Sequence, residues 1–372
     1  PAVDGPVQEG RARQGDASYH LGQVHVLALA GGLAIPLLLY DQPYLIRVAA
    51  SVLYFIILSS SWNLLLGYAG QLSFAHAAFA GIGAYTSGLL SAGFLGDNFC
   101  TSLVENGLGV VSDLLCGENY SRDFSYGVHP GISIFVGGAV AAGIGWCLGR
   151  MCLRTRGPYL ALMTLGFSET VRLILQIEHE YTRGSLGLRI PYLWTTDDGL
   201  PNHAVGYLIM LALTVITIVV LYYLVNSEKG LFFKAIREDE DVAAVMGVDL
   251  VKWKVNAFVI SSAFAGLAGA IYAHLFVQVL APQMLLLLEM GLILAMTIVG
   301  GLGTLTGPII GAILLVVLWE FMRDISPYAH MLLFATLVII VMKFFREGIF
   351  GLIARRLKAK NLISKAPPFT VE

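Results

Sequence analysis

Long apolar runs with almost no charge constrain this chain more than any other feature. Ten such runs follow one another along its 372 residues. Most of them are long enough to cross a hydrocarbon core of roughly 30 Å, which takes a helix of about 20 residues. Hydrophobic residues make up 57% of the chain and charged residues only 13%. Because so few polar residues are left to cover a soluble core, the apolar excess is expected to face lipid.

The continuity of these runs favours helices over a β-barrel. Only helices and closed barrels satisfy every backbone polar group within a bilayer, and barrel strands would show short alternating segments. We therefore expect an all-α polytopic membrane protein with about 8–10 transmembrane helices, some of them broken at glycine. The predicted spans are Val24–Tyr40, Leu45–Leu66, Gln71–Leu90, Gly131–Gly149, Tyr159–Gln176, Val205–Val225, Val255–Val277, Leu285–Val299, Pro308–Phe321 and Ala329–Met342.

The positions of Lys and Arg predict the orientation, because these residues accumulate in cytoplasmic segments. With the N-terminus inside, all but six of the 23 Lys and Arg residues fall in inner segments. Both termini are then cytoplasmic. Residues 1–22 form a polar tail that we expect to be disordered, residues 23–345 the transmembrane domain, and residues 346–372 a basic tail. Residues 226–254 form an inner loop, and residues 93–130 an extended outer loop. The first residues lack the apolar centre of a signal peptide.

Two cysteines, Cys100 and Cys116, lie in the predicted outer loop. In an oxidising compartment they could form a disulfide, which would close a loop of about 15 residues and contribute roughly 3 kcal/mol. Two unpaired loop cysteines are the alternative, and the sequence leaves both open.

The segment Trp62–Tyr85 combines several glycines with polar side chains inside an apolar stretch. Glycine lets helices pack closely, and a helix break at membrane depth is tolerated only where protein or a water-filled cavity covers it. One interpretation is a broken helix that lines a translocation pathway. The other is a tight helix–helix contact in which Ser73 and His76 form hydrogen bonds between helices.

A second glycine-rich segment, Thr297–Pro308, repeats part of the first. Gly67, Gly70 and Leu72 match Gly300, Gly303 and Leu305 at a constant offset. Paired glycine-interrupted segments in the two halves of a transporter indicate a translocation pathway. Because the background is rich in glycine, a chance match is the alternative.

The inner loop contains apolar residues at helical spacing from Phe232 to Met246, followed by Gly247 as the predicted stop. The other face is acidic, from Glu238 to Asp241. An amphipathic helix below the membrane is suited to a partner's groove, whereas a helix that lies on lipid prefers a basic face. We expect a protein partner here; a solvated connector is the alternative.

Ionisable residues are rare within the spans and are therefore candidates for function. Glu169 and Arg172 lie three residues apart on one helix face and are predicted to pair. The complete set of candidates for the translocation pathway is Asn63, Gln71, Ser73, His76, Tyr85, Thr164, Glu289, Thr297, Gly300, Gly301 and Gly303.

Four ordered blocks resemble the LivM-type permeases of branched-chain amino acid ABC importers. These blocks are Trp62–His76 (WNLLLGYAGQLSFAH), Thr155–Gly166 (TRGPYLALMTLG), Lys234–Gly247 (KAIREDEDVAAVMG) and Ser262–Tyr272 (SAFAGLAGAIY). The resemblance runs from about Ala49 to Leu357. The third block is similar to the coupling-helix motif through which such permeases contact their ATPases. It implies an ATPase-coupling role for Arg237, Glu238, Asp239, Asp241, Ala243, Ala244 and Gly247.

The resemblance also implies the partners and the location of the chain. It implies a second homologous permease, two ATP-binding subunits that hold ATP and Mg, a periplasmic substrate-binding protein, and multi-pass insertion in the bacterial cytoplasmic (inner) membrane. The chain has no phosphate-binding loop of its own. We expect no cofactor, metal or catalytic residue in it, no nucleic acid partner, and no enzymatic activity.

The expected substrate is a branched-chain or related amino acid. A permease for urea or another small polar or acidic solute is the alternative within the same family. This choice stays open because the outer loop 93–130 and the stretch Thr182–Leu188 depart from the family pattern. An ion-coupled secondary transporter is the rival from another class. It would need carboxylates or carbonyl rings at mid-depth, which are scarce here.

Overall fold

The computed structural model describes residues 42–92, 128–151, 157–179, 181–193, 202–277, 279–325 and 335–336. The predicted span Val24–Tyr40, nearly all of the span Ala329–Met342, both predicted tails, and Cys100 and Cys116 lie outside these residues.

The described chain is built almost entirely from helices. The long ones are α2 (Pro43–Asn63), which continues as a π-helical turn, η1 (Leu64–Tyr68), then α3 (His76–Ser91), α6 (Pro130–Met151), α7 (Pro158–Ile177), α8 (His203–Asn226), α11 (Leu250–Phe276), α12 (Leu287–Gly300) and α13 (Gly307–Ile325). Five of the described helices are long and apolar enough to cross a membrane: α2 with η1, α6, α7, α8 and α11. The protein is therefore an all-α polytopic membrane protein, as its apolar runs predict.

Short elements connect the long helices. Two helices, α9 (Glu228–Glu238) and α10 (Glu240–Val245), lie between α8 and α11. Two 3₁₀ turns, η3 (Gly184–Leu186) and η4 (Pro282–Leu285), flank the strands β1 (Leu188–Arg189) and β2 (Val279–Leu280). The strands pair antiparallel, with Leu188 opposite Leu280.

Each of the eight predicted spans between Leu45 and Phe321 overlaps one of these helices, but the third helix begins later than predicted. The prediction placed its start at Gln71, whereas α3 begins at His76. The chain turns at Gly70, whose φ is +68°. The residues that follow find hydrogen-bond partners outside a helix, since Gln71 N donates to Leu65 O at 2.8 Å and Phe74 N donates to Thr164 Oγ1 at 2.9 Å.

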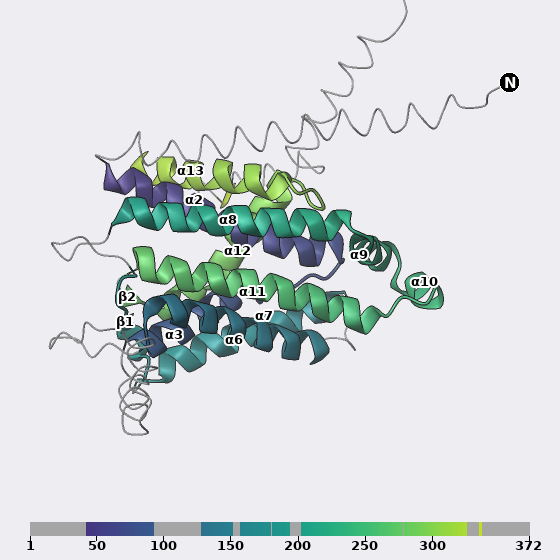
Figure 1. Cartoon of the computed structure of the whole chain (residues 1–372), viewed down its shortest axis with the longest axis horizontal. Coiled ribbons are helices and arrows are strands. Elements are labelled where there is room, and N and C mark those ends of the chain that lie inside the picture. Colours follow the sequence, from purple (N-terminus) through teal and green to yellow (C-terminus); the bar gives the residue numbers. More distant parts are fainter. Residues whose placement is uncertain are drawn as a thin grey trace, which may run out of the picture.

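The long helices lie side by side, with α9 and α10 at one end of the bundle and the β1–β2 pair at the other (Figure 1). The chain leaves α3 and enters α6 at the β1–β2 end, where Val128 N donates to Leu90 O at 2.9 Å. The inner loop and the outer loop predicted from the charge pattern therefore begin at opposite ends of the bundle. Which end faces the cytoplasm stays a prediction.

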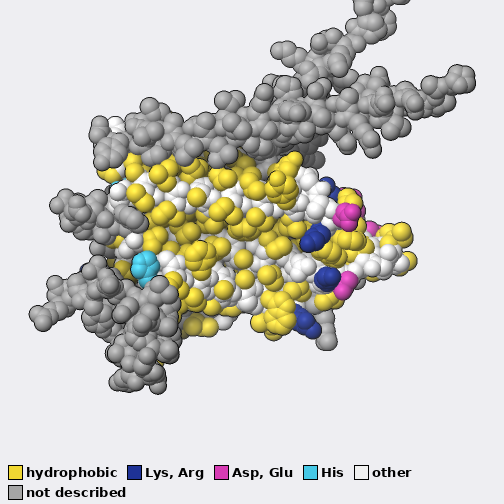
Figure 2. All heavy atoms as spheres, viewed as in Figure 1, with side chains coloured by type: hydrophobic (Ala, Val, Ile, Leu, Met, Phe, Trp, Pro, Cys, Tyr) yellow, Lys and Arg dark blue, Asp and Glu magenta, His cyan; other side chains and the backbone are white. Residues whose placement is uncertain are grey.

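The surface of the bundle agrees with insertion in a membrane. On the face shown in Figure 2, hydrophobic side chains cover the length of the helices, and the charged side chains gather at the end formed by α9 and α10. Water-exposed charge at the end and an apolar flank are what a spanning bundle requires.

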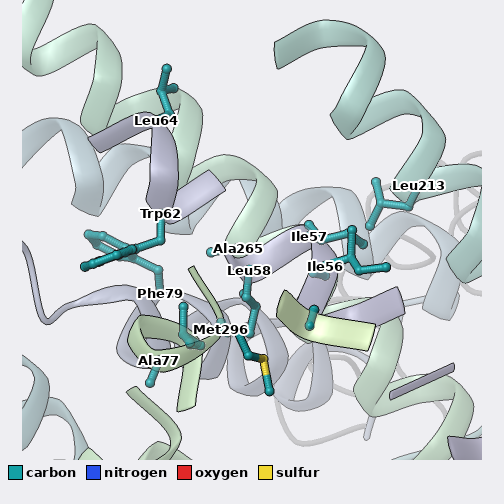
Figure 3. Packing of buried hydrophobic residues seen from close by; sticks show 14 of the residues in the cluster. Ile56, Ile57, Leu58, Trp62, Leu64, Ala77, Phe79, Leu213, Ala265 and Met296 are labelled. Atoms are coloured by element: carbon teal, nitrogen blue, oxygen red, sulfur yellow. The ribbon is translucent and has the colours of Figure 1, made fainter. Parts of the chain in front are cut away.

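Glycine holds the helices α3, α6 and α11 in direct backbone contact. A Cβ atom added to Gly269 of α11 would lie 2.1 Å from the carbonyl oxygen of Ala80 in α3. One on Gly83 of α3 would lie 2.2 Å from Gly266 O, and one on Gly137 of α6 would lie 2.4 Å from Gly83 O. Side chains fill the rest of the core, where Leu58 and Trp62 of α2 lie in one cluster with Phe79 of α3 and Met296 of α12 (Figure 3).

A buried polar network joins the helices near the β1–β2 end. His274 Nε2 and Ser87 Oγ lie 2.8 Å apart, Ser87 and Ser133 share a hydrogen bond of 2.9 Å, and His274 Nδ1 lies 2.8 Å from Pro191 O. Tyr85 donates to Leu280 O at 3.0 Å and thereby ties α3 to β2. These bonds fix the loops at this end of the bundle.

We predict that Gly269→Ala lowers the free energy of unfolding by about 1–3 kcal/mol, because the new methyl group would overlap backbone atoms of α3. Gly143→Ala is the matched control, since a Cβ at Gly143 has no atom within 4 Å, and it should raise stability by up to about 1 kcal/mol. Denaturation in detergent micelles measures both. Equal effects of the two substitutions would contradict the backbone contact.

Candidate functional site

The two glycine-rich segments meet in the structure, where Asn63 of the first contacts Gly303 of the second, 240 residues further along the chain. Gly303 N donates to Asn63 Oδ1 at 2.9 Å, and Asn63 Nδ2 donates to Thr304 O at 2.8 Å. A Cβ on Gly67 would lie 2.7 Å from Gly303 N. We call this contact, formed by residues 63–70 and 300–307, the glycine junction.

The matched glycines of the two segments adopt similar conformations. Gly70 has a φ of +68° and Gly303 a φ of +73°, a region that favours glycine. Each segment also interrupts a pair of helices: α2 with η1 gives way to α3 at His76, and α12 ends at Gly300 before α13 begins at Gly307. The match in sequence therefore corresponds to two similar helix breaks, which lie against each other.

The turn before the first break is π-helical. In η1 the hydrogen bonds skip one more residue than in an α-helix, and Ala69 N donates to Leu64 O at 3.1 Å. Single π-helical turns recur at functional sites because they insert a local irregularity into a helix. Here the irregularity lies directly beside the second glycine segment.

Arg237, at the end of α9, inserts its side chain into the glycine junction. Its Nη1 donates to Gly67 O at 2.5 Å. A Cβ on Gly303 would lie 2.6 Å from the same Nη1, and a Cβ on Gly70 would lie 3.1 Å from Arg237 Cα. The absence of side chains at both matched glycines thus makes room for one arginine, which contacts both segments at once.

The predicted single helix from Phe232 to Met246 is wrong: it consists of two helices, α9 and α10, separated at Asp239. Asp239 is extended, with a φ of −157°, and its Oδ1 accepts hydrogen bonds from Asp241 N at 2.9 Å and Val242 N at 3.1 Å. Aspartate is a strong N-cap, so it starts a new helix here instead of continuing the old one. The predicted stop at Gly247 is confirmed by its φ of +87°.

Both short helices are fixed to the beginning of α11. The ring of Trp253 stacks on Phe232 with a centroid distance of 4.9 Å and meets Phe233 edge-on at 5.6 Å. Lys254 Nζ lies 2.6 Å from a carboxylate oxygen of Glu240 in α10. The start of α11 is therefore in direct contact with both α9 and α10.

The outer face of α10 is apolar and exposed. Val245 is 87% exposed, Met246 79% and Val242 58%. Of the two predicted coupling alanines, Ala243 is buried against its own chain and only Ala244 is exposed. The predicted acidic coupling residues Glu238, Asp239 and Asp241 are exposed around this face.

Most of the candidate pathway residues are buried. The buried polar side chains among them are Asn63, Gln71, Ser73, His76, Tyr85, Thr164 and Thr297. Thr164 accepts from the backbone N of Phe74 in the first helix break, and His76 Nε2 lies 3.1 Å from Ser61 Oγ in α2. Sequence reasoning missed Trp62, whose Nε1 donates to Ser73 O at 2.7 Å. A pattern of glycines and polar residues does not reveal which aromatic side chain faces the break.

Two polar atoms near the first break have unused bonding capacity. Among the described residues, Gln71 Oε1 and His76 Nδ1 are buried and have no hydrogen-bond partner. Glu289 is half-buried in the first turn of α12, towards the β1–β2 end, and lies apart from the glycine junction. The assignment of all these residues to a translocation pathway stays a prediction.

Comparison with known proteins matches the sequence of this chain to one family. A family model described as branched-chain amino acid transport system / permease component matches residues 44–342. The high-affinity branched-chain amino acid transport system permease protein LivM of Escherichia coli is 31% identical over 344 residues, which cover 86% of this chain and 73% of that protein. LivM of Salmonella typhimurium is also 31% identical, over 340 residues, 85% of this chain and 72% of that protein.

A second kind of permease matches as well. The high-affinity branched-chain amino acid transport system permease protein LivH of Salmonella typhimurium is 23% identical over 274 residues, 70% of this chain and 78% of that protein. No solved structure matches the chain at a significant level. The resemblance to LivM-type permeases drawn from the four sequence blocks is confirmed.

We predict that Asn63→Ala loosens the glycine junction, because it leaves Gly303 N and Thr304 O without a buried partner. The cost should be about 1–3 kcal/mol in the free energy of unfolding. Asn226→Ala, at the exposed end of α8, is the control. Hydrogen exchange at Gly303 gives a second, local measurement. Unchanged exchange there in Asn63→Ala would show that the junction does not depend on this side chain.

Proposed function

Because the chain belongs to the family of branched-chain amino acid transport permeases, we propose that it forms one half of the membrane pathway of an ATP-driven importer for branched-chain or related amino acids. A second, homologous permease forms the other half. The match to both LivM and LivH relatives supports this pairing, since both are named as permeases of a branched-chain amino acid transport system. The substrate class is taken from the same names.

The contact of Arg237 with both glycine segments is the observation that carries the mechanism. One of two ATP-binding subunits, which hold ATP and Mg, docks on the exposed face of α10 around Val245 and Met246, and the other docks on the second permease. An apolar helix face is suited to a partner's groove. When these subunits close on ATP, they displace α10 and with it α9, because Asp239 joins the two directly.

Movement of α9 reaches the helix breaks through one side chain. Arg237 holds Gly67 O and lies against Gly303, so a shift of α9 acts on η1 and on the segment after α12 together. These are the irregular parts of the bundle, where a change in backbone conformation disturbs the fewest helical hydrogen bonds. Rearrangement at the glycine junction then alters the angle between the paired helices and switches access across the membrane.

The orientation of the helix bundle in the membrane is inferred from the charge pattern and is also a proposal. The α9–α10 end faces the cytoplasm of a bacterial cell with the chain in the inner membrane, both termini are cytoplasmic, and the β1–β2 end receives a periplasmic substrate-binding protein. Lys and Arg residues predominate in the segments assigned to the inner side.

We predict that cysteines at the two ends of the bundle are labelled from opposite sides. In a variant that lacks the native cysteines, Ala244→Cys should react with a membrane-impermeant maleimide only after the inner face is opened. Leu186→Cys, at a position that is 82% exposed, should react in intact cells with a permeable outer membrane. Labelling of Ala244→Cys from outside would reverse the orientation and exclude cytoplasmic ATPases as partners of α10.

We predict that Arg237→Gln separates ATP hydrolysis from transport. In reconstituted complexes the ATPases should stay bound and hydrolyse ATP, while uptake falls by about tenfold or more, because a charged hydrogen bond worth about 1.5–3 kcal/mol is lost. Lys234→Gln on the same helix is the control, since Lys234 is exposed and lies outside the glycine junction. The measurements are substrate uptake, ATP turnover and subunit co-purification.

A second arm uses Val245→Glu, which places a charge on the exposed apolar face of α10. Here the ATPases should no longer co-purify, and ATP turnover should be lost together with uptake. If Arg237→Gln transports as well as Lys234→Gln, the link through the glycine junction is wrong. If Val245→Glu retains its ATPases, α10 is not their docking site.

A further inference from the structure

The helix α7 carries an ion pair in the middle of an otherwise apolar exposed face. Glu169 and Arg172 are joined by a salt bridge, and Arg172 Nη1 donates to Gln176 Oε1 at 2.8 Å. All three residues belong to α7, so the network stabilises itself without a second helix. The predicted pairing of Glu169 with Arg172 is thus confirmed. Both carboxylate oxygens of Glu169 accept from Arg172, yet 44% of the Glu169 side chain stays exposed, and the carboxylate can accept a further hydrogen bond.

The position of the pair along α7 places it far from both ends. Glu169 lies eleven residues after Pro158 and eight before Ile177. At 1.5 Å per residue this is roughly 16 Å and 12 Å from the two helix ends. A long side chain at this depth has no short route to water, so the exposed part of the Glu169 side chain would face hydrocarbon if lipid surrounded α7. Charge in this position is costly and is normally turned towards protein or a hydrated cavity.

The comparison with the neighbouring helices shows that α7 is exceptional. The exposed face of α6 carries Phe135 and Val140, and its only charged residue, Arg150, lies next to its last residue. The exposed face of α8 carries Ile216 and Val219, and that helix contains no Asp, Glu, Lys or Arg. These two faces are suited to lipid. Only 22% of the most apolar stretch of α7 is buried, against 39% for both α6 and α8, so α7 is the least covered of the five candidate spans and yet contains a central ion pair.

The exposed face of α7 is also shaped for close approach. Gly166 has no atom within 4 Å of the position of a Cβ, so the backbone there is open. Thr170, one turn further, turns its hydroxyl back to Gly166 O at 2.7 Å and presents a small surface. Small residues four apart allow another membrane helix to pack closely, and a polar group on that helix can then complete a hydrogen-bond network.

We propose that this face of α7, centred on Gly166, Glu169 and Leu173, docks against the second permease subunit, which supplies a hydrogen-bond donor to the outward oxygens of Glu169. The proposal rests on the proposed function, because it takes its partner from there. A homologous permease is the fitting occupant since it shares the membrane depth of the ion pair, which a water-soluble subunit does not reach. The chain itself also matches both LivM and LivH relatives.

Site-specific photo-crosslinking in the full complex tests the contact. A photoreactive phenylalanine analogue replaces Leu173, which is 42% exposed and lies one turn from Glu169, and in a parallel sample it replaces Ile216, which is 54% exposed on α8. Illumination of native membranes should join the Leu173 variant to the second permease, while the Ile216 variant should form adducts with lipid. Mass spectrometry of the products identifies both.

The outcomes separate this proposal from the proposed function. If the second permease co-purifies but the Leu173 variant forms adducts with lipid alone, α7 faces lipid and the interface lies elsewhere, while the importer assignment stands. If no second permease co-purifies with the unmodified chain, the proposed pairing fails, and this interface with it.

A double substitution gives an independent measurement. Glu169→Leu with Arg172→Leu makes α7 uniformly apolar, which does not hinder membrane insertion. If the ion pair bonds to the second permease, the amount of that subunit recovered with the chain should fall about tenfold or more, because charged hydrogen bonds are lost. Ile216→Leu with Val219→Leu on α8 is the control and should change nothing. Equal or greater recovery of the second permease in the α7 variant would overturn the proposal.

Discussion

Backbone contact at glycine holds this protein together. In lipid the hydrophobic effect does not drive helices against one another, so close packing and hydrogen bonds must do so. Helices α3, α6 and α11 meet where Gly83, Gly137 and Gly269 leave no room for even a methyl group. The side chains around Trp62 then fill the remaining space beside α2 (Figure 3). Long helices that are apolar on all sides thereby acquire one defined arrangement.

The small size of glycine also allows the two helix breaks to lie against each other. A chain that leaves a helix within a membrane must bond its free backbone groups inside the protein. Asn63 does so for Gly303 N and Thr304 O, and Trp62 and Thr164 do so for the stretch before α3. Because each break relies on a few side chains and not on a full ladder of helical bonds, it can rearrange without unfolding a helix. In the proposed mechanism, a movement at the α9–α10 end acts on these breaks.

Charged residues are few in this protein, and the described ones lie in three kinds of location. On the face shown in Figure 2 the charged side chains gather at the α9–α10 end, where they are hydrated and surround the exposed apolar face of α10. The guanidinium of Arg237 extends from this end to the glycine junction, where it donates to Gly67 O. One ion pair, Glu169 with Arg172, sits at mid-depth on α7. The α9–α10 end, the glycine junction and the exposed face of α7 thus each contain a different kind of charged contact.

The sequence by itself determined the membrane class, the approximate positions of eight described helices, the stop at Gly247 and the pairing of Glu169 with Arg172, because each depends on residues that are close along the chain. Hydropathy, a positive φ at glycine and a spacing of three residues are local properties. Only the tertiary structure decided that α3 begins at His76, that Ala243 turns inward, and that Arg237 reaches a junction between two segments far apart along the chain. These depend on which distant backbone groups lack a partner, and a local pattern does not contain that information.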